Sequence, residues 1–361
     1  MLHFFPHYAT DVEETPFAAE LRRLGVPYRV FGAAISLRYR SAFERLFSVY
    51  PRLGWLALRS AARSLLLSRP RPTAAIVNTD LEALVFGIVR GIFRLPTLIV
   101  FETLIITPRR SSWVNALRRR YFALILSLVD VAICHSTVEV ARCREAFAKT
   151  RCRFAFVPFG TTVTGREGLI AADAAAGDQD RVIVTAGRSG RDYRTLAEAI
   201  RGLPCQLQII CDLPGPVAGI EPSDQITIIR DCFHAAYIAK LASALFVVVP
   251  LSVDDISAGQ MVLLQASALG RAVITTRTAT TTDYVTDGAD ALLVDIGDVA
   301  QMRAAIIRLL EDRALRDRLG AGAAARFERD HSTEAYVRKL VAAIEAPDLR
   351  PDQAAARRSP A

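Results

Sequence analysis

The chain has 361 residues, of which 52% are hydrophobic and 23% charged, and it carries a formal net charge of +8. This length favours two domains over one, and this composition excludes a disordered chain. No run reaches about 18 apolar residues without a charge, and the N-terminal MLHFFPHYATDVEE has neither a basic start nor a long apolar core, so we expect no membrane-spanning helix and no signal peptide.

Apolar β-forming runs alternate with helical patterns along the whole chain, which is typical of α/β domains with parallel sheets. In the first half we predict strands at Leu2–Pro6, Tyr28–Phe31, Ala74–Asn78, Thr97–Phe101, Val131–Cys134 and Phe154–Val157. The helices predicted between them are Pro16–Leu24, Leu81–Phe93, Val114–Leu128 and Thr137–Phe147.

Positive charge is concentrated in the first half of the chain. Residues 1–160 contain 23 Lys and Arg against 11 Asp and Glu, and the remainder contains 22 against 26. Residues 38–72 alone hold eight arginines and one acid among Leu, Phe, Trp and Tyr. A basic amphipathic helix of this type can lie on an anionic membrane, although the outer face of an ordinary packed helix has the same pattern. No nucleic-acid motif accompanies the charge, so we expect no nucleic-acid partner.

The composition predicts a boundary near the middle of the chain. Residues 163–180 are small, polar and glycine-containing, as in a linker, and a second series of strands and helices follows. We therefore predict two doubly wound, Rossmann-like α/β domains in tandem, at 1–162 and 181–345, with the option that the terminal helices pack back on the first domain. Residues 346–361 are too poor in apolar side chains to pack and are predicted to be a disordered tail.

Two loops of the second domain have the chemistry of an anion site. In open parallel sheets, ligands bind beyond the carboxyl ends of the strands. One such loop contains Gly187, Arg188 and Arg191, where glycine permits close approach of the backbone and arginine offers bidentate hydrogen bonds to phosphate oxygens. A solvated loop with surface arginines would have the same composition.

The second loop is VDDISAGQ, which leads into a helix predicted at Gln260–Leu269. That helix begins after Gly259, so its free N–H groups at Gln260 and beyond can hold a phosphate. Ser257 can cap the helix. Gln265 lies among apolar residues and needs hydrogen-bond partners, which either sugar hydroxyls or neighbouring backbone can supply.

The first domain offers fewer polar residues at strand ends. His7 and Tyr8 follow the first strand, and Glu102 stands at the end of another, where a carboxylate can act as a base or bind an acceptor hydroxyl. A solvent-facing carboxylate is the plain alternative for Glu102. The six cysteines form no CxxC pair and have no histidine at metal-ligand spacing, so we expect neither disulfides nor a metal site.

The second-domain loops resemble those of the retaining, nucleotide-sugar-dependent glycosyltransferases of the GT-B fold, the group 1 or family 4 type. GRSGRDYRTLAEAI is similar to that family's G-R-x-x-x-K-D stretch, shortened, with Arg191 at the lysine. VVVPLSVDDISAGQMVLLQASALGRAVITT is similar to its P-S-x-x-E-G-x-G-x-x-x-L-E-A block, and VDVAICHSTVEVARCREAF and DYVTDGADALLV resemble flanking segments. The similarity extends weakly before residue 125 and more strongly from 129 to 340.

The resemblance implies two Rossmann-like domains with a cleft between them, donor mainly on the second and acceptor on the first. Arg188 and Arg191 would neutralise the donor diphosphate. Apart from the resemblance, residues 230–234 follow a predicted strand and are expected to border the base. The family's E-x7-E motif is degenerate here, because Ser257 and Gln265 stand where it has glutamates. Asp254 or Asp255, slightly upstream of Ser257, is one source of a replacement carboxylate.

The leading hypothesis is therefore metal-free glycosyl transfer, with retention, from a nucleoside diphosphate sugar to a glycan or lipid-linked acceptor in cell-surface polysaccharide or glycolipid synthesis. Arg188, Arg191 and Glu102 are the predicted catalytic residues, and His7 and Tyr8 lie on the acceptor side. Two alternatives remain open: a nucleotide-sugar 2-epimerase, and a catalytically degenerate scaffold in a glycan-assembly complex. We expect no cofactor and a cytoplasmic location, with the option of peripheral attachment to the inner face of the plasma membrane through residues 38–72.

Overall fold

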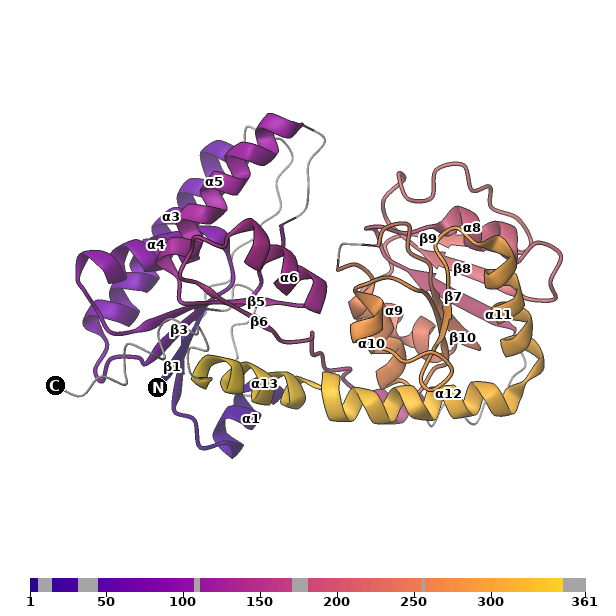
Figure 1. Ribbon diagram of the computed structural model, residues 1–361. Helices are drawn as coiled ribbons and strands as arrows, with labels where there is room; N and C mark the ends of the chain where they lie inside the picture. The colour runs from indigo at the N-terminus through magenta and orange to yellow at the C-terminus, as the bar shows by residue number, and fades with distance from the viewer. Residues whose placement is uncertain (6–14, 32–44, 107–110, 171–180, 255–256, 347–361) are drawn as a thin grey trace. The chain divides into compact units, whose positions relative to one another are not determined.

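The computed structural model describes residues 1–5, 15–31, 45–106, 111–170, 181–254 and 257–346. The chain divides into two compact units, one of Met1–Val157 together with the segment from Val337, and one of Pro158–Tyr336. Each unit is built on a six-stranded parallel sheet with helices on its faces (Figure 1). The predicted fold class, two Rossmann-like doubly wound α/β domains in tandem, is confirmed.

The unit boundaries differ from the predicted domain ranges at both ends of the second domain. The first unit ends at Val157 rather than at 162. The chain returns to it at Val337, inside the range 181–345 but in agreement with the predicted option that the terminal helices pack back on the first domain. The return is held by side chains, since Arg338 forms an ion pair with Glu20 at 3.1 Å and Arg153 donates to the carbonyl of Ala343. Within the predicted linker, residues 166–170 are helical and 171–180 lie outside the described residues, as do 347–361 of the predicted tail.

In the first unit the strand order is β2-β1-β3-β4-β5-β6, all parallel. Helices α3, α4 and α5 lie on one side of this sheet and α1 and α13 on the other (Figure 1). The elements are β1 (Leu2–Phe4), α1 (Pro16–Arg23), β2 (Tyr28–Val30), η2 (Arg45–Val49), α3 (Tyr50–Ala61), η3 (Ala62–Leu67), β3 (Ala74–Val77), α4 (Asp80–Ile92), β4 (Leu98–Phe101), α5 (Ser112–Leu128), β5 (Val131–Cys134), α6 (Thr137–Ala146), β6 (Arg153–Phe156) and α13 (Thr333–Glu345).

In the second unit the order is β12-β11-β10-β7-β8-β9, again all parallel. The elements are β7 (Val182–Ala186), α8 (Tyr193–Ala199), β8 (Gln206–Ile210), β9 (Ile226–Ile229), α9 (His234–Ala242), β10 (Phe246–Val249), α10 (Gln260–Ala268), β11 (Val273–Thr276), η4 (Thr281–Asp283), β12 (Leu292–Val294), α11 (Val299–Glu311), α12 (Arg313–Arg326) and η5 (Phe327–His331).

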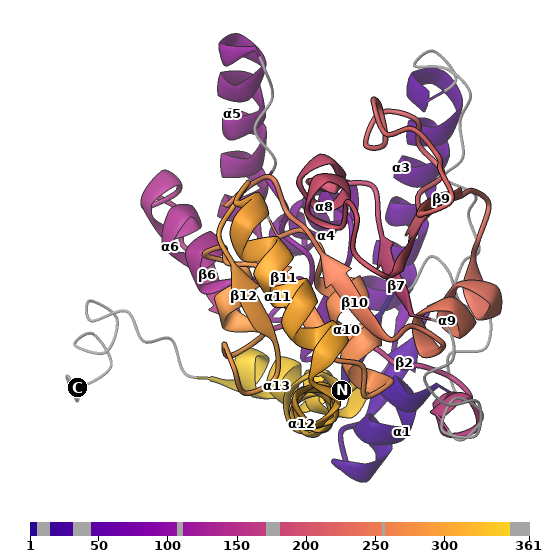
Figure 2. The same cartoon turned by 90° about the vertical axis from the view of Figure 1, so that its right-hand side faces the viewer.

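The second sheet is apolar on both faces because helices cover both. Successive residues of a strand point to opposite faces, and Ile183 and Val248 join the core beneath α8 and α11, while Val184 and Val247 join the core beneath α9 and α10. Figure 2 shows α11 lying along β11 and β12, which it contacts. A strand buried on both faces reads as a continuous apolar run, as β10 does with the sequence FVVV.

The strand order places a topological switch point between β7 and β10. From β7 the chain proceeds through β8 to β9 on one side, and it then crosses to β10 and continues outward through β11 to β12. Loops leaving the carboxyl ends of the two strands at a switch point diverge, and the crevice between them is the usual ligand site of such sheets. The loops in question are those after β7 and β10, which lead into α8 and α10.

Candidate functional site

Arg191 lies at the switch point and is held against the backbone of the loop after β7. Its Nε donates to the carbonyl of Ala186 at 2.8 Å and its Nη1 to the carbonyl of Ser189 at 2.9 Å. Gly187, with φ of 119°, makes room for the guanidinium, because a Cβ there would lie 2.3 Å from Arg191 Nη2. The arginine is therefore fixed in place by the main chain.

The guanidinium of Arg191 has no carboxylate partner among the described residues, although it is half-buried. Burial lowers the pKa of Arg191 from its ordinary value, since desolvation disfavours the charged form. A partly desolvated cation without a counter-ion gains from a bound anion. The neighbouring strand end holds the loop in position, since the N–H of Asp192 donates to the carbonyl of Pro250.

The N-terminus of α10 lies beside the same arginine. Gly259 is the N-cap residue with φ of 89°, and a Cβ there would lie 2.8 Å from Val249 Cγ1 and 3.6 Å from Arg191 Nη1. Only glycine fits this approach. No side chain caps the first N–H groups of α10. The partial positive charge of these groups therefore lies beside the positive charge of the Arg191 guanidinium.

Ser257 does not cap the helix, contrary to one prediction from the sequence. The cap position is Gly259, two residues later, and it has no side-chain cap bond. The Oγ of Ser257 and the Nε2 of Gln260 are both buried, and neither has a hydrogen-bond partner among the described residues. Buried polar atoms normally are hydrogen-bonded, so these two atoms at a helix N-terminus indicate a polar ligand.

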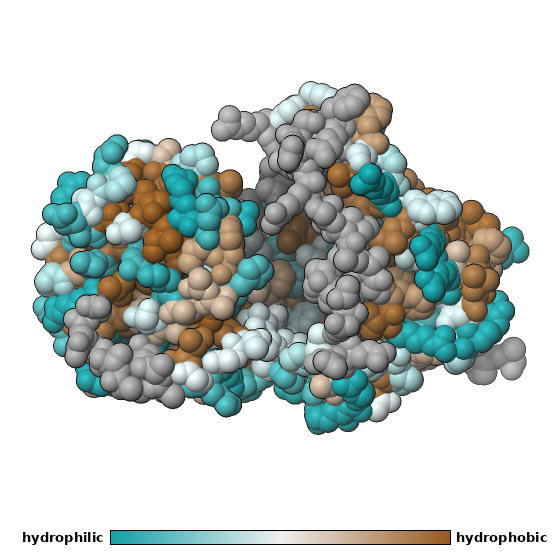
Figure 3. Space-filling view, turned by 180° about the vertical axis from the view of Figure 1, so that it is seen from behind, coloured by the Kyte–Doolittle hydropathy of each residue, from teal (hydrophilic) through white to brown (hydrophobic). Residues whose placement is uncertain are grey.

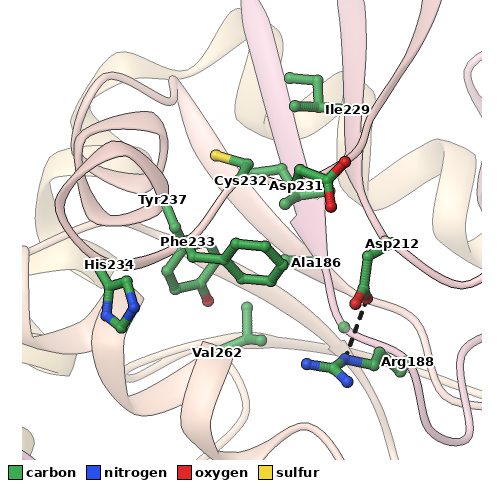
Figure 4. A pocket seen from close by; sticks show the side chains of 12 residues that line it. Ala186, Arg188, Asp212, Ile229, Asp231, Cys232, Phe233, His234, Tyr237 and Val262 are labelled. Carbon is green, nitrogen blue, oxygen red and sulfur yellow. Dashed lines mark ion pairs between the residues drawn. The ribbon is translucent and has the colours of Figure 1, made fainter. Parts of the chain in front are cut away.

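Arg188 lies in the same loop after β7 and is more exposed than Arg191. Its Nε is 3.1 Å from Oδ1 of Asp212, which follows β8, and 56% of its side chain is accessible. Figure 4 shows this pair on one side of a cavity, opposite the loop after β9. An exposed ion pair contributes little stability, so Arg188 can exchange Asp212 for another anion at small cost.

The cavity has a volume of about 260 Å³ and is enclosed by the loops after β7, β8 and β9 together with α9 and α10. Apolar side chains such as Val262, Ile210 and Ile229 form its walls, with Phe233 and Tyr237 on the side of α9 (Figure 4). Predominantly apolar walls with a few polar groups are typical of sites for planar organic ligands.

Two non-glycine residues of the loop after β9 have left-handed backbone conformations, Asp231 with φ of 52° and His234 with φ of 51°. Such conformations cost free energy and cluster at ligand sites. Both residues line the cavity, as do Cys232 and Phe233 between them. The stretch that the sequence placed beside the base is thus a strained loop along one wall of this cavity.

Gln265 on α10 accepts a hydrogen bond from the hydroxyl of Tyr237 on α9, at 3.0 Å. Burial raises the pKa of the Tyr237 phenol, which keeps it protonated as a donor. The predicted partners of Gln265 were sugar hydroxyls or backbone, and the structure supplies a side chain instead. Its carbonyl oxygen retains a second lone pair for a ligand hydroxyl.

Asp254 and Asp255, the two aspartates upstream of Ser257, were predicted as sources of a replacement carboxylate, and the structure describes only the first of them. Oδ1 of Asp254 accepts the backbone N–H of Ala279 at 2.7 Å, so this carboxylate joins the loop after β10 to the loop after β11. Asp255 lies outside the described residues. The hydroxyl of Thr281 likewise bonds to Thr276 and Thr278 within its own loop. These groups hold the loops together in the structure as it stands.

The predicted residues of the first domain are placed only in part. Glu102 directly follows β4 at the carboxyl edge of its sheet, half-buried, with its N–H donating to the carbonyl of Val77 at 2.9 Å. His7 and Tyr8 lie outside the described residues. In the described ranges, no group of three or more His, Cys, Asp or Glu side chains gathers as a metal site would require. All six cysteines are free.

Sequence comparison matches residues 180–312 to the family described as Glycosyl transferases group 1. This span contains every second-unit residue discussed above. Among curated proteins, no sequence matches the chain significantly. The family match supports an enzyme of the transferase class.

Solved structures with the same fold cover nearly the whole chain. Sucrose-phosphate synthase from Thermosynechococcus elongatus superposes with a TM-score of 0.70 at 17% identity, covering 94% of this chain and 97% of its own. Trehalose 6-phosphate synthase from Burkholderia multivorans gives 0.63 at 13%, covering 99% of each chain. HepE from Anabaena, in complex with UDP and glucose, gives 0.62 at 14%, covering 96% of this chain and 99% of its own.

Proposed function

We propose that the protein is a glycosyltransferase that moves a sugar from a nucleoside diphosphate sugar, of the UDP type, to an acceptor hydroxyl. One observation carries the proposal: Arg191 is a backbone-held guanidinium without a carboxylate partner among the described residues, beside the uncapped N-terminus of α10. A fixed cation next to a helix N-terminus is a site for a diphosphate. The family match and the UDP bound to HepE support this choice of anion.

The cavity next to Arg191 has the chemistry to hold the nucleoside. Apolar walls from Val262 and Ile229 suit a planar base, and the strained stretch from Asp231 to His234, which lines the same cavity, would border its edge. Gln265, fixed by Tyr237, would accept a ribose hydroxyl with its remaining lone pair.

Ser257 Oγ and Gln260 Nε2 would then bond to the diphosphate or to donor sugar hydroxyls. Each is a buried polar atom without a hydrogen-bond partner among the described residues. A hydrogen bond to the ligand would offset the free-energy cost of burying that atom. As the glycosidic bond breaks, negative charge develops on the diphosphate. Arg191, Arg188 and the N–H groups of α10 would stabilise that charge in the transition state without a metal.

The acceptor, in this proposal, is a glycan or a lipid-linked saccharide bound by the first unit, and transfer proceeds with retention in cell-surface polysaccharide or glycolipid synthesis. Glu102, at a carboxyl strand end, would bind or deprotonate the acceptor hydroxyl. His7 and Tyr8 remain acceptor-side candidates from the sequence alone.

Calorimetric titration with UDP, GDP, ADP and their glucose and mannose conjugates tests the donor site. We expect binding of a nucleoside diphosphate, weakened about 10- to 100-fold by Arg191→Ala, because a charge-assisted hydrogen bond contributes about 1.5–3 kcal/mol. Arg194→Ala is the matched control, an exposed arginine on the following helix α8. No binding by any nucleotide, or equal losses in both variants, would contradict the proposal, and binding without release of nucleotide in the presence of acceptors would favour the scaffold alternative.

A further inference from the structure

Helices α3, α4 and α5 form one layer on the first sheet, with α4 in contact with both neighbours. The close approach of α4 and α5 depends on Gly87, where a Cβ would lie 2.6 Å from Cβ of Leu128. The inner sides of the three helices contribute to the core of the first unit. The exposed residues on their outer sides are together called the three-helix face.

The three-helix face exposes large apolar side chains. Trp55 on α3 is 68% exposed and Trp113 on α5 is 70% exposed. On α5 the apolar residues recur along one stripe, because Leu117 and Leu124 follow Trp113 at helical spacing. Further exposed apolar residues of the layer and its ends are Leu58, Leu67, Ile88, Ile92 and Phe93. Figure 3 shows apolar residues beside hydrophilic ones on the surface of this unit. Apolar exposure of this extent marks an interaction site.

The charge on this face is positive. Four exposed arginines, Arg52, Arg59 and Arg63 on α3 and η3 and Arg120 on α5, have no ion pair or side-chain hydrogen bond within the described ranges. Neither 50–67 nor 112–128 contains an acidic residue. The acids of α4 lie at its N-terminus, where Glu82 is buried in a capping box with Thr79. The excess of arginine over acidic residues noted for residues 38–72 is therefore also found on α5.

We propose that the three-helix face binds an anionic lipid bilayer, with Trp55 and Trp113 at the boundary between headgroups and acyl chains. Arginine would neutralise lipid phosphates, and tryptophan is the side chain most favoured at that depth. A second copy of the chain fits less well, because a symmetric contact would place unpaired arginines against one another. The described residues contain no helix able to cross a membrane. The proposal does not depend on the glycosyltransferase activity.

The chain contains two tryptophans, and both lie on this face. Tryptophan emission, excited selectively, therefore reports on this face alone. The full-length protein is mixed with vesicles of equal parts phosphatidylglycerol and phosphatidylcholine, or of phosphatidylcholine only. With the anionic vesicles we expect a blue shift of tryptophan emission, quenching by brominated acyl chains and co-sedimentation. These signals weaken as salt is raised, and pure phosphatidylcholine gives at least tenfold weaker binding.

Paired substitutions locate the contact. Arg59→Gln with Arg120→Gln is expected to weaken vesicle binding by about 25-fold, at about fivefold for each arginine. The matched control is Arg308→Gln with Arg313→Gln, two exposed arginines of the second unit, with little change expected. Trp55→Ser with Trp113→Ser tests the apolar part by sedimentation, and Ile296→Ser, an exposed apolar residue of the second unit, is its control. Circular dichroism verifies that each variant is folded.

Several outcomes would overturn the proposal. These are unshifted emission with anionic vesicles, equal binding to neutral and anionic vesicles, or equal sedimentation of the folded tryptophan variant and the native chain. Dimerisation abolished by the tryptophan pair, without vesicle binding, would assign the face to a second copy. Nucleotide titrations run in parallel keep a failure here distinct from a failure of the donor site.

Discussion

The guanidinium of Arg191 lies directly on the main chain of Gly187, at a position that a single methyl group would occupy. A Cβ at residue 187 would be 2.3 Å from Nη2 and 2.7 Å from Cζ of Arg191. The arginine keeps this place through bonds to the carbonyls of Ala186 and Ser189. The glycine and the arginine thus act as one unit, which makes the glycine a test of the site.

Gly187→Ala is predicted to weaken nucleoside diphosphate binding about tenfold or more, because Arg191 must leave its position. The substitution also strains a backbone with φ of 119°. Gly202→Ala is the control for strain alone, since residue 202 has φ of 73° and a Cβ there meets no atom within 4 Å. Both variants should unfold at somewhat lower temperature, whereas calorimetric titration should show a loss of affinity in Gly187→Ala only. Equal affinities would mean that Arg191 does not contact the nucleotide.

Asp212→Asn is predicted to strengthen nucleotide binding, by up to about fivefold. Asp212 forms an ion pair with Arg188 at 3.1 Å, and an anionic ligand has to compete with it. An exposed pair of this kind is worth at most about 1 kcal/mol. Arg188→Ala should weaken nucleotide binding. A weaker Asp212→Asn complex would show that the carboxylate orients Arg188 for the ligand rather than competing with it.

Gln265→Glu is predicted to tighten nucleoside diphosphate binding severalfold, because a carboxylate accepts a ribose hydroxyl more strongly than an amide does. The hydroxyl of Tyr237, which donates to Gln265 at 3.0 Å, can donate to the glutamate as well. Titration with the free base and with the nucleoside separates this effect from contacts to phosphate. An unchanged affinity for the nucleoside would place the ribose away from residue 265.

Stability is predicted to fall between about pH 6.5 and pH 4 because of two buried histidines. Burial lowers the pKa of His3 and of His135 from 6.5 to about 4. Above pH 6.5 both histidines are neutral in the folded chain and in the unfolded chain. Between the two values the unfolded chain binds protons that the folded chain does not, so unfolding is favoured as pH falls. The loss approaches roughly 3 kcal/mol for each histidine by pH 4.

Urea unfolding at a series of pH values measures this effect. His3→Gln keeps a polar partner for Ser64, whose hydroxyl lies 2.8 Å from His3 Nδ1, and removes the titration. The double variant with His135→Asn should show a flatter profile over the same range. A profile equal to that of the native chain would assign the acid loss to other groups.

The sheets and their order of elements were predictable because their signals are local. Val131–Cys134 was predicted as a strand with the bounds that β5 has, and the other strands predicted in the first half differ by one or two residues at their ends. Apolar runs of this length record burial on both faces of a sheet, and the sequence shows them directly. The predicted strands fixed which loops lie at the carboxyl ends of the sheet, where ligands bind. Arg191 and Gly259 could therefore be chosen as candidate anion-site residues without a structure.

Side-chain partners could not be predicted in the same way. Capping of α10 by Ser257 was one option from the sequence, but Gly259 has that position and leaves the hydroxyl without a described partner. Gln265 is engaged by Tyr237 from another helix, and Asp254 by the backbone of Ala279 in another loop. Each partner is distant in the sequence, so no local pattern records it.

By itself, the sequence determined two α/β domains, the loops that carry a candidate anion site and a basic segment in the first half, because composition and periodicity are properties of adjacent residues. The tertiary structure decided which of these residues meet. Arg191 is backbone-held while Arg188 is paired with Asp212. Trp55 and Trp113 belong to one helical layer because α4 packs between α3 and α5. Contacts between distant segments depend on strand order and helix packing, which only the folded chain establishes.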